Sequence, residues 1–324
     1  MKIFFAYRLP GKSEPVWIEG NAMRVSELTS IPKDGFVFHS FFGDEIYILQ
    51  EYTVINETQF LCFISEESTQ KSVTKNEYES QFATYQNELQ SGRFQKLILS
   101  RVKKMNTKKS ALELFHDLNL KYPTSYNTIF SSAETGTWIG ASPELLLRSE
   151  GTKIETVALA GTKPADVQTA WTTKEEKEQA FVTDYILAVL RQNQLQQITV
   201  SEPYTITAGS IQHIKTDISA QLNSDNQLLS ILKDLHPTPA TCGIPTKDAL
   251  KKIKETESHE RKFYAGFFGI IQNGRSEFFV NLRCMELFSE FALLYLGGGI
   301  TKESEVEKEW IETEKKAETL GKLL

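Results

Sequence analysis

The 324-residue chain has 36 basic and 42 acidic side chains, a net charge of −6, and 40% hydrophobic residues. This balance is ordinary for a globular protein with a substantial core and argues against nucleic acid or an anionic membrane surface as the main partner. Three cysteines without CxxC or paired spacing argue against a disulfide scaffold and structural zinc. Neither a signal-peptide core nor a bilayer-length apolar run is present. We therefore expect a cytoplasmic protein without a membrane partner.

Residues 1–70 are predicted to form short strands separated by polar turns. The clearest of these strands cover residues 35–40, 45–49 and 60–64. The first helix is predicted over residues 75–90, because its large apolar residues recur at spacings of four, three and four, and a Ser-Gly pair ends it.

The rest of the chain mixes strands and helices in irregular order. Further strands are predicted over residues 95–102, within 126–160, and over 198–202, 211–218, 263–272, 276–287 and 291–296. Further helices are predicted over residues 110–120, 174–195, 226–235, 246–256 and 305–323. Strands in antiparallel-looking succession with interspersed helices indicate an α+β (mixed α/β) fold rather than a doubly wound sheet. Because no Gly-, Ser- or Pro-rich linker divides the chain, we predict a single large domain over residues 1–324.

Two acidic clusters lie on predicted helices. Glu175 and Glu178 share one face at the start of the long helix. Glu309, Glu312 and Lys316 share one face of the last helix. Carboxylates from two helices suit a hard cation such as Mg²⁺. Solvated salt-bridge faces have the same spacing and are the more frequent origin of such clusters.

Two single residues are candidates for proton transfer. Lys96 lies among apolar neighbours in a predicted strand, where its amine either reaches the surface, the usual case, or is desolvated and able to act as a base. Glu144 lies between a strand and an apolar run, where a carboxyl either has a raised pKa and acts as an acid or simply faces water.

Three successive glycines, Gly297, Gly298 and Gly299, follow a predicted strand and precede the last helix. Unshielded backbone N–H groups at such a place are typical of an anion cradle, and also of a tight turn. His213 and His236 each occur alone, and a lone histidine is more often structural than catalytic.

Ten short segments occur together in this chain in a fixed order. They are Lys-Leu-Ile-Leu-Ser-Arg (96–101), Gly-Ala-Ser-Pro-Glu-Leu-Leu (140–146), Ala-Leu-Ala-Gly-Thr (158–162), Glu-Lys-Glu-Gln-Ala-Phe-Val-Thr-Asp (176–184), Ile-Gln-His (211–213), His-Pro-Thr-Pro-Ala-Thr-Cys-Gly-Ile-Pro (236–245), Glu-Arg-Lys-Phe-Tyr-Ala-Gly (260–266), Leu-Arg-Cys (282–284), Gly-Gly-Gly-Ile (297–300) and Glu-Trp-Ile-Glu-Thr-Glu-Lys-Lys (309–316). In this order they resemble the chorismate-utilising enzyme family, which also includes anthranilate, aminodeoxychorismate and salicylate synthases. The resemblance covers residues 75–324, the expected catalytic core, whereas residues 1–70 carry no assignable motif and are expected to be the variable N-terminal strands.

The resemblance implies the aminodeoxychorismate synthase-like fold and the conversion of chorismate to isochorismate. It implies that Lys96 activates water for attack at C2 and that Glu144 protonates the hydroxyl leaving C4. It also implies a Mg²⁺ cofactor that binds the ring carboxylate. The metal-binding positions are Glu175, Glu178, Glu309 and Glu312. The substrate-binding positions, several of them around the pyruvyl carboxylate, are Gly161, Thr162, His213, Ala240, Tyr264, Arg283, Gly297, Gly299 and Lys316.

Individual positions separate the members of this family. Where this chain has Ala158 and Ala160, the resemblance implies proline in anthranilate synthases and lysine in aminodeoxychorismate synthases, respectively, so neither activity nor an amidotransferase subunit is expected. Ala240, where salicylate synthases tend to have threonine, favours a product that keeps its enolpyruvyl group. Two departures from the family pattern are Gln179 in place of histidine and Gly298 in place of alanine.

Three hypotheses follow from these residues. The first is a monomeric isochorismate synthase that feeds menaquinone or siderophore biosynthesis, which begin with the same reaction. The second is a salicylate synthase, which uses the same site and continues to loss of pyruvate. The third is a chorismate-binding protein of the same fold without catalysis, which the retained proton-transfer candidates disfavour.

Overall fold

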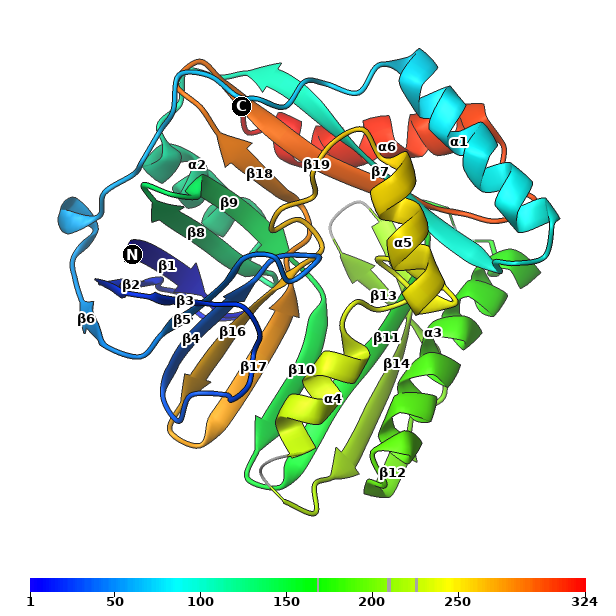
Figure 1. Cartoon of the computed structure of the whole chain (residues 1–324), viewed down its shortest axis with the longest axis horizontal. Helices are drawn as coiled ribbons and strands as arrows, with labels where there is room; N and C mark the ends of the chain where they lie inside the picture. The colour runs from blue at the N-terminus through cyan, green and yellow to red at the C-terminus, as the bar shows by residue number, and fades with distance from the viewer. Residues whose placement is uncertain (168, 209–210, 225–226) are drawn as a thin grey trace.

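The computed structural model describes residues 1–167, 169–208, 211–224 and 227–324, and its description leaves out the side chains of Thr162, Pro164, Lys174, Ala208 and Ile211. Two large sheets form the centre of the molecule, with helices around them (Figure 1). Every ladder between the described strands is antiparallel. The predicted mixed α/β class with antiparallel-rich sheets is therefore confirmed.

The first sheet carries the strands of several predicted site residues. Its order is β15-β7-β19-β18-β9-β8-β1-β2-β6. The strands are β1 (Lys2–Arg8), β2 (Val16–Asn21), β6 (Tyr52–Val54), β7 (Lys96–Asn106), β8 (Tyr126–Ser132), β9 (Gly136–Ser142), β15 (Gly243–Ile244), β18 (Cys284–Leu287) and β19 (Phe291–Ile300). The long β7 and β19 lie side by side over ten residue pairs, so their side chains are held in a fixed register.

The second sheet has the order β12-β14-β11-β10-β17-β16-β4-β5-β3, with β13 paired to β14. Its strands are β3 (Met23–Val25), β4 (Gly35–His39), β5 (Ile46–Leu49), β10 (Leu145–Glu150), β11 (Lys153–Pro164), β12 (Gln196–Val200), β13 (Tyr204–Ala208), β14 (Ile211–Gln221), β16 (Phe267–Gln272) and β17 (Arg275–Val280). N-terminal strands enter both sheets, because β1 pairs with β8 and β4 pairs with β16.

Most of the helices cover the outer faces of the two sheets, whereas the first and the fifth bury apolar residues in the core between the sheets (Figure 1). They are α1 (Lys75–Gln90), α2 (Ala111–Lys121), α3 (Thr173–Gln192), α4 (Gln227–Leu235), α5 (Thr246–Thr256) and α6 (Val306–Gly321), with a 3₁₀ turn, η1 (Glu57–Gln59). Capping boxes start α1 and α2, in which Thr74 and Ser110 exchange hydrogen bonds with a glutamate three residues later. None of the described helices is both long and apolar enough to cross a bilayer.

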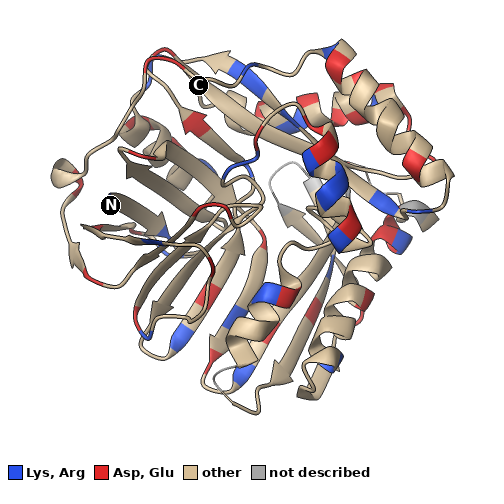
Figure 2. Cartoon of the chain, in the orientation of Figure 1, with Lys and Arg blue, Asp and Glu red and all other residues tan. Residues whose placement is uncertain are grey.

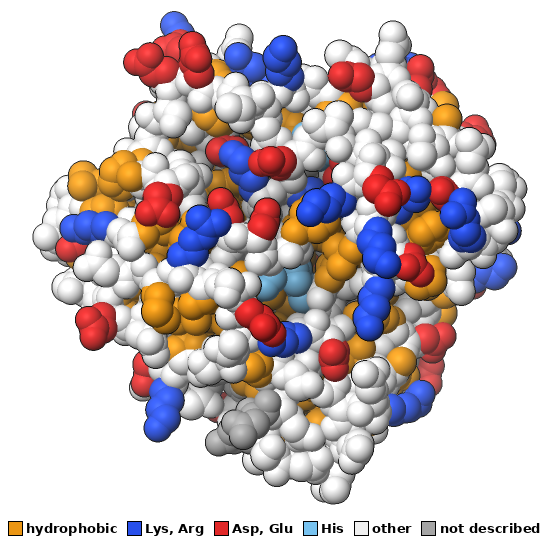
Figure 3. Space-filling view, in the orientation of Figure 1, with side chains coloured by type: hydrophobic (Ala, Val, Ile, Leu, Met, Phe, Trp, Pro, Cys, Tyr) orange, Lys and Arg blue, Asp and Glu red, His pale blue; other side chains and the backbone are white. Residues whose placement is uncertain are grey.

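The core between the sheets is built from aromatic side chains. The ring of Phe38 lies 4.9 Å from Phe5 and 4.5 Å from Phe130, which joins β4 of one sheet to β1 and β8 of the other. Trp138 packs edge-on against Phe263 at 5.6 Å. Acidic and basic side chains alternate along the outer helices and across the face shown, without a patch of one sign (Figures 2 and 3).

Several predicted elements differ from the structure. The strand predicted over residues 60–64 is wrong, because this stretch is irregular. Its Phe60 is buried and packs edge-on against Trp17, whereas Leu61 and Ile64 are exposed. The strand predicted over residues 276–287 is two strands, β17 and β18. The triple glycine is neither a turn nor the start of a helix, because it lies inside β19 and pairs with β7.

Candidate active site

Lys96 begins β7 and is 5% exposed. A Cβ on Gly299 of the neighbouring β19 would lie 2.5 Å from its Cε and 3.1 Å from its Nζ. The lysine therefore occupies the space that a side chain at this glycine would fill. Its Nζ lies 3.6 Å from a carboxylate oxygen of Glu178 on α3, so the amine ends beside a predicted metal ligand rather than at the surface.

Glu144 is held between β9 and β10 by its own backbone. Its carbonyl accepts a hydrogen bond from the N–H of Val280 at 3.0 Å, and its N–H donates to Ser142 Oγ at 3.3 Å. Burial raises the pKa of this carboxyl to about 7, although the nearby cations Lys96 and Arg283 act in the opposite direction. At neutral pH a large fraction of the group therefore carries a proton that it can donate.

Tyr264 and Arg283 approach the same space. The Tyr264 hydroxyl lies 2.6 Å from the place of a Cβ on Gly297, so this glycine also makes room for a site residue. Arg283 has a φ of +47°, a conformation that L residues adopt rarely and that is frequent at functional sites. Burial lowers its pKa, while Tyr122 and Glu144 raise it. Arg283 and Glu144 are thus close enough to interact electrostatically.

Lys316 on α6 joins this group through the backbone of β19. Its Nζ donates to the carbonyl of Gly297 at 2.9 Å and pairs with Glu312 at 2.7 Å. His213 contacts the carbonyl of Gly161 through Nδ1 at 2.9 Å. Burial lowers the pKa of His213 to about 4, and Arg283 and Lys316 act in the same direction. His213 is consequently a neutral donor or acceptor at physiological pH.

The four predicted metal ligands have the carboxylate oxygens that Mg²⁺ prefers. Glu178 contacts Lys96, and Glu312 contacts Lys316. Glu309 Oε1 accepts from Ser304 Oγ at 2.7 Å, and its Oε2 would lie 3.4 Å from a Cβ on Gly298. Glu175 accepts from the Thr172 N–H in the capping box of α3. Within the described ranges no three His, Cys, Asp or Glu groups converge closely enough to hold an ion, so the magnesium site stays a prediction.

The remaining candidates have different surroundings. Ala240 is half-buried against the core of the second sheet. The side chain of Thr162 lies outside the described residues. His236 lines a surface cavity of about 310 Å³ together with His39 and Phe41, and it contacts the carbonyl of Phe41 at 3.1 Å. Burial lowers its pKa to about 3, which gives it the structural role favoured for a lone histidine.

Gln179, one of the departures from the family pattern, has a defined structural role. Its side chain is 2% exposed, and Nε2 donates to the carbonyl of Ala158 on β11 at 2.9 Å and to Thr216 Oγ1 on β14 at 3.0 Å. These bonds fix α3 on the second sheet one residue after Glu178. The glutamine thus supports the helix that carries two predicted metal ligands.

Comparison with known proteins identifies the family of the chain. Residues 48–324 match the family described as chorismate binding enzyme. Isochorismate synthase EntC of Escherichia coli (strain K12) is 32% identical over 239 residues, which cover 69% of this chain and 61% of EntC. The matched region thus spans less than two thirds of that relative.

Two solved structures show the same fold over 99% of this chain. A putative 2,3-dihydroxybenzoate-specific isochorismate synthase, DhbC from Bacillus anthracis, has a TM-score of 0.80 and 24% identity, with 95% of its chain covered. The menaquinone-specific isochorismate synthase MenF from Escherichia coli has a TM-score of 0.85 and 21% identity, with 88% covered. With a family match over most of its length and this fold, the chain belongs to the family of chorismate-binding enzymes.

Proposed function

We propose that this protein is an isochorismate synthase, which adds water at C2 of chorismate and releases the hydroxyl from C4. The observation that carries the proposal is a buried lysine, Lys96, that interacts electrostatically with a buried carboxyl, Glu144, whose pKa is raised to about 7. A reaction that removes a proton at one carbon and supplies one at another needs a base and an acid at the same time. These two groups meet that requirement without a covalent intermediate.

These two residues account for both proton transfers of the reaction. Lys96 in its neutral form accepts a proton from the attacking water as the C2–O bond forms. Glu144 in its protonated form gives a proton to the C4 oxygen as that bond breaks, and water leaves. The ring double bonds shift between the two carbons, so no oxidant or reductant is involved. Exchange of protons with solvent afterwards returns both residues to their starting forms.

A substrate with two carboxylates needs two binding regions. Arg283, Lys316 and Tyr264 supply cationic and hydroxyl donors for the pyruvyl carboxylate. The carboxylates of α3 and α6, Glu178 and Glu312 foremost, would hold Mg²⁺ with Glu175 and Glu309 nearby. When bound, the ion would neutralise the ring carboxylate.

The identity of the product distinguishes this proposal from its alternative. Purified protein incubated with chorismate and Mg²⁺ is expected to form isochorismate, and chromatography of the products checks this. Salicylate with an equal amount of pyruvate as the main product would instead indicate a salicylate synthase. Absence of any turnover, with chorismate still bound, would support the non-catalytic hypothesis.

We further propose that the enzyme works without an amidotransferase subunit. The support comes from two positions in the sequence. Anthranilate synthases have proline at the position of Ala158, and aminodeoxychorismate synthases have lysine at the position of Ala160. Addition of ammonium salts should therefore leave the product unchanged. Formation of anthranilate or aminodeoxychorismate under those conditions would contradict this part of the proposal.

The glycines of β19 offer a matched pair of substitutions. Gly299→Ala would place a Cβ 2.5 Å from Lys96 Cε, so the lysine must move, whereas a Cβ at Gly298 lies 3.4 Å from its nearest neighbour. A displacement of about 1 Å can reduce turnover by about 10²-fold. We expect this loss in kcat for Gly299→Ala and a much smaller change for Gly298→Ala. Equal losses in the two variants would contradict the placement of Lys96.

A further inference from the structure

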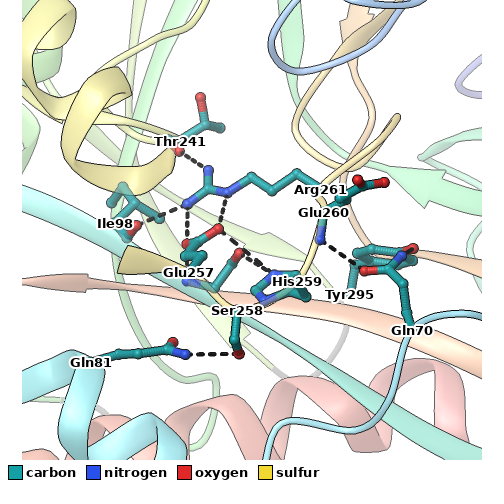
Figure 4. Close-up of polar contacts among 11 residues, drawn as sticks. Gln70, Gln81, Ile98, Thr241, Glu257, Ser258, His259, Glu260, Arg261 and Tyr295 are labelled. Atoms are coloured by element: carbon teal, nitrogen blue, oxygen red, sulfur yellow. Dashed lines mark hydrogen bonds and ion pairs between the residues drawn. The ribbon is translucent and has the colours of Figure 1, made fainter. Parts of the chain in front are cut away.

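A buried ion pair contacts the edge of β7, the strand that carries Lys96. Glu257 caps the end of α5, and Arg261 follows four residues later in the irregular segment after this helix. The pair has the fork geometry of an arginine and a carboxylate, with Nη2 to Oε1 at 2.6 Å and Nε to Oε2 at 2.8 Å (Figure 4). Both side chains are at most 2% exposed. We call this pair the Glu257–Arg261 clamp.

The clamp takes the place of a neighbouring strand at the edge of β7. The two-residue β15 pairs with β7 at Lys96 and Leu97, and no other strand in the described part of the chain continues this ladder. Farther along β7, the carbonyl of Ile98 accepts from Arg261 Nη2 at 2.9 Å, and the N–H of Ser100 donates to Glu257 at 2.7 Å. Without the clamp these buried backbone groups would lose their partners.

The same guanidinium also binds the segment that carries Ala240. Arg261 Nη1 donates to the carbonyl of Thr241 at 2.8 Å, one residue after Ala240 (Figure 4). The planar fork thus bridges two carbonyls and one carboxylate, and its face packs on the ring of Phe41 at 4.3 Å. This side chain therefore adds a link between the Lys96 strand and the Ala240 segment, beside the direct backbone bonds of β15 with β7 and of the Ile98 N–H with the carbonyl of Cys242 at 3.0 Å.

Surrounding contacts keep the clamp itself in place. Gln81 on α1 donates to Ser258 Oγ at 2.9 Å, and the N–H of Glu260 donates to Gln70 at 2.8 Å. Gln70 in turn donates to the Tyr295 hydroxyl on β19 at 2.7 Å (Figure 4). Ser100 Oγ contacts His259 Nε2 at 2.9 Å. These bonds attach the clamp to α1, β7 and β19.

We propose that the Glu257–Arg261 clamp is a positioning element that holds Lys96 at the correct place relative to the Ala240 segment, so that turnover depends on it beyond its effect on folding. This inference rests on the proposed role of Lys96 as the base. Neither residue of the clamp touches the reacting atoms in this arrangement. The expected signature is a fall in kcat that is larger than any rise in KM, because the misplaced base affects the chemical step more than it affects substrate binding through the Ala240 segment.

Two variants test the clamp. Glu257→Gln combined with Arg261→Met removes both charges, which proteins tolerate better than the loss of one partner of a buried pair. Arg261→Lys keeps the charge but loses the planar fork. We expect kcat to fall by about 10²-fold in the double variant and by a smaller factor in Arg261→Lys. A kcat equal to that of wild type in a folded sample of either variant would overturn the proposal.

Arg8→Lys is the matched control. Arg8 is a buried arginine at the end of β1 that also bridges two carbonyls, those of Asn119 and Tyr122, at 2.6 and 2.7 Å. The strands β19, β18, β9 and β8 separate β1 from β7. This variant should lose stability and keep its kcat. If kcat fell as much in Arg8→Lys as in Arg261→Lys at equal thermal stability, the effect would be purely structural and the inference would be wrong.

Hydrogen–deuterium exchange gives a readout that does not need turnover. In Arg261→Lys, peptides covering residues 95–101 and 238–245 should both exchange faster, whereas neither should change in Arg8→Lys. Unchanged exchange in these peptides would overturn the clamp whatever the activity. If the wild-type protein formed no isochorismate, but both peptides still exchanged faster in Arg261→Lys than in the wild type, the proposed function would be refuted. The structural link between the two segments would then still hold.

Discussion

Replacing Lys96 by alanine is expected to lower kcat for isochorismate formation by about 10²- to 10⁴-fold, the usual contribution of a general base. The amine is buried, lies beside Gly299, and ends 3.6 Å from Glu178. The variant should remain folded, because alanine removes the buried charge and leaves both ladders of β7 intact. Steady-state kinetics with chorismate, together with thermal unfolding, measure the two effects separately.

Lys104→Ala provides the control for this prediction. Lys104 lies on the same strand, is exposed, and packs over the ring of Phe291 at 3.7 Å. Its removal should leave kcat unchanged. Full activity of Lys96→Ala would refute the assignment of the base, whereas an equal loss in Lys104→Ala would show that β7 is merely sensitive to substitution.

Local sequence signals predicted the helices well. The helix predicted over residues 75–90 is α1, and Thr74 with Glu77 forms the capping box that fixes its start. The helix predicted over residues 110–120 agrees with α2 in the same way, through Ser110 and Glu113. Such bonds form between residues three apart, so the sequence contains all the information that they need.

The sequence motifs predicted which residues belong to the site but not how they are arranged, because the arrangement depends on contacts between residues that are distant in the chain. The predicted strand ends at residue 296 and leaves Gly297–Gly299 as either an anion cradle or a tight turn, because glycines have no side chains to alternate. The continuation of β19 through these glycines depends on its pairing with β7. Lys96 illustrates the same limit. A lysine in a strand usually reaches the surface, and here a glycine two hundred residues later makes room for it inside.

The burial of Arg261 and its backbone contacts could not be predicted from the spacing of charged residues alone. Glu257 and Arg261 are four residues apart, a spacing typical of solvated salt bridges on exposed helices. In the structure the pair is buried and its donors bind backbone carbonyls of two other segments. One signal in the sequence was available, because Arg261 belongs to one of the ten matching segments without having an assigned role.

Replacing Glu144 by glutamine is expected to lower kcat by about 10²- to 10⁴-fold and to change the pH dependence of the reaction. The acid is active in its protonated form, and burial raises the pKa of Glu144 to about 7. In the wild type, kcat should therefore fall as the pH rises through about 7. The residual activity of Glu144→Gln should lack this limb, which a kcat profile between pH 5.5 and 9 would reveal; a limb retained in the variant would assign the titration to another group.

Although Glu144→Gln should lower kcat, it should increase the stability of the folded protein at high pH. Because the folded pKa is above the ordinary value of 4.5, the neutral carboxyl favours the folded state below pH 4.5, and this contribution is lost as the pH rises through about 7. The loss amounts to roughly 3 kcal/mol at high pH. Glutamine has no charge to bury, so Glu144→Gln should unfold at a higher temperature than wild type at pH 8 but not at pH 4.5.

Glu45→Gln separates the two effects of this substitution. Burial also raises the pKa of Glu45, which precedes β5 in the second sheet and has no proposed part in the reaction. Its glutamine variant should gain stability at pH 8 in the same sense while keeping the wild-type kcat and pH profile. If Glu144→Gln stabilised the protein at pH 8 and also kept full activity, Glu144 would not be the acid.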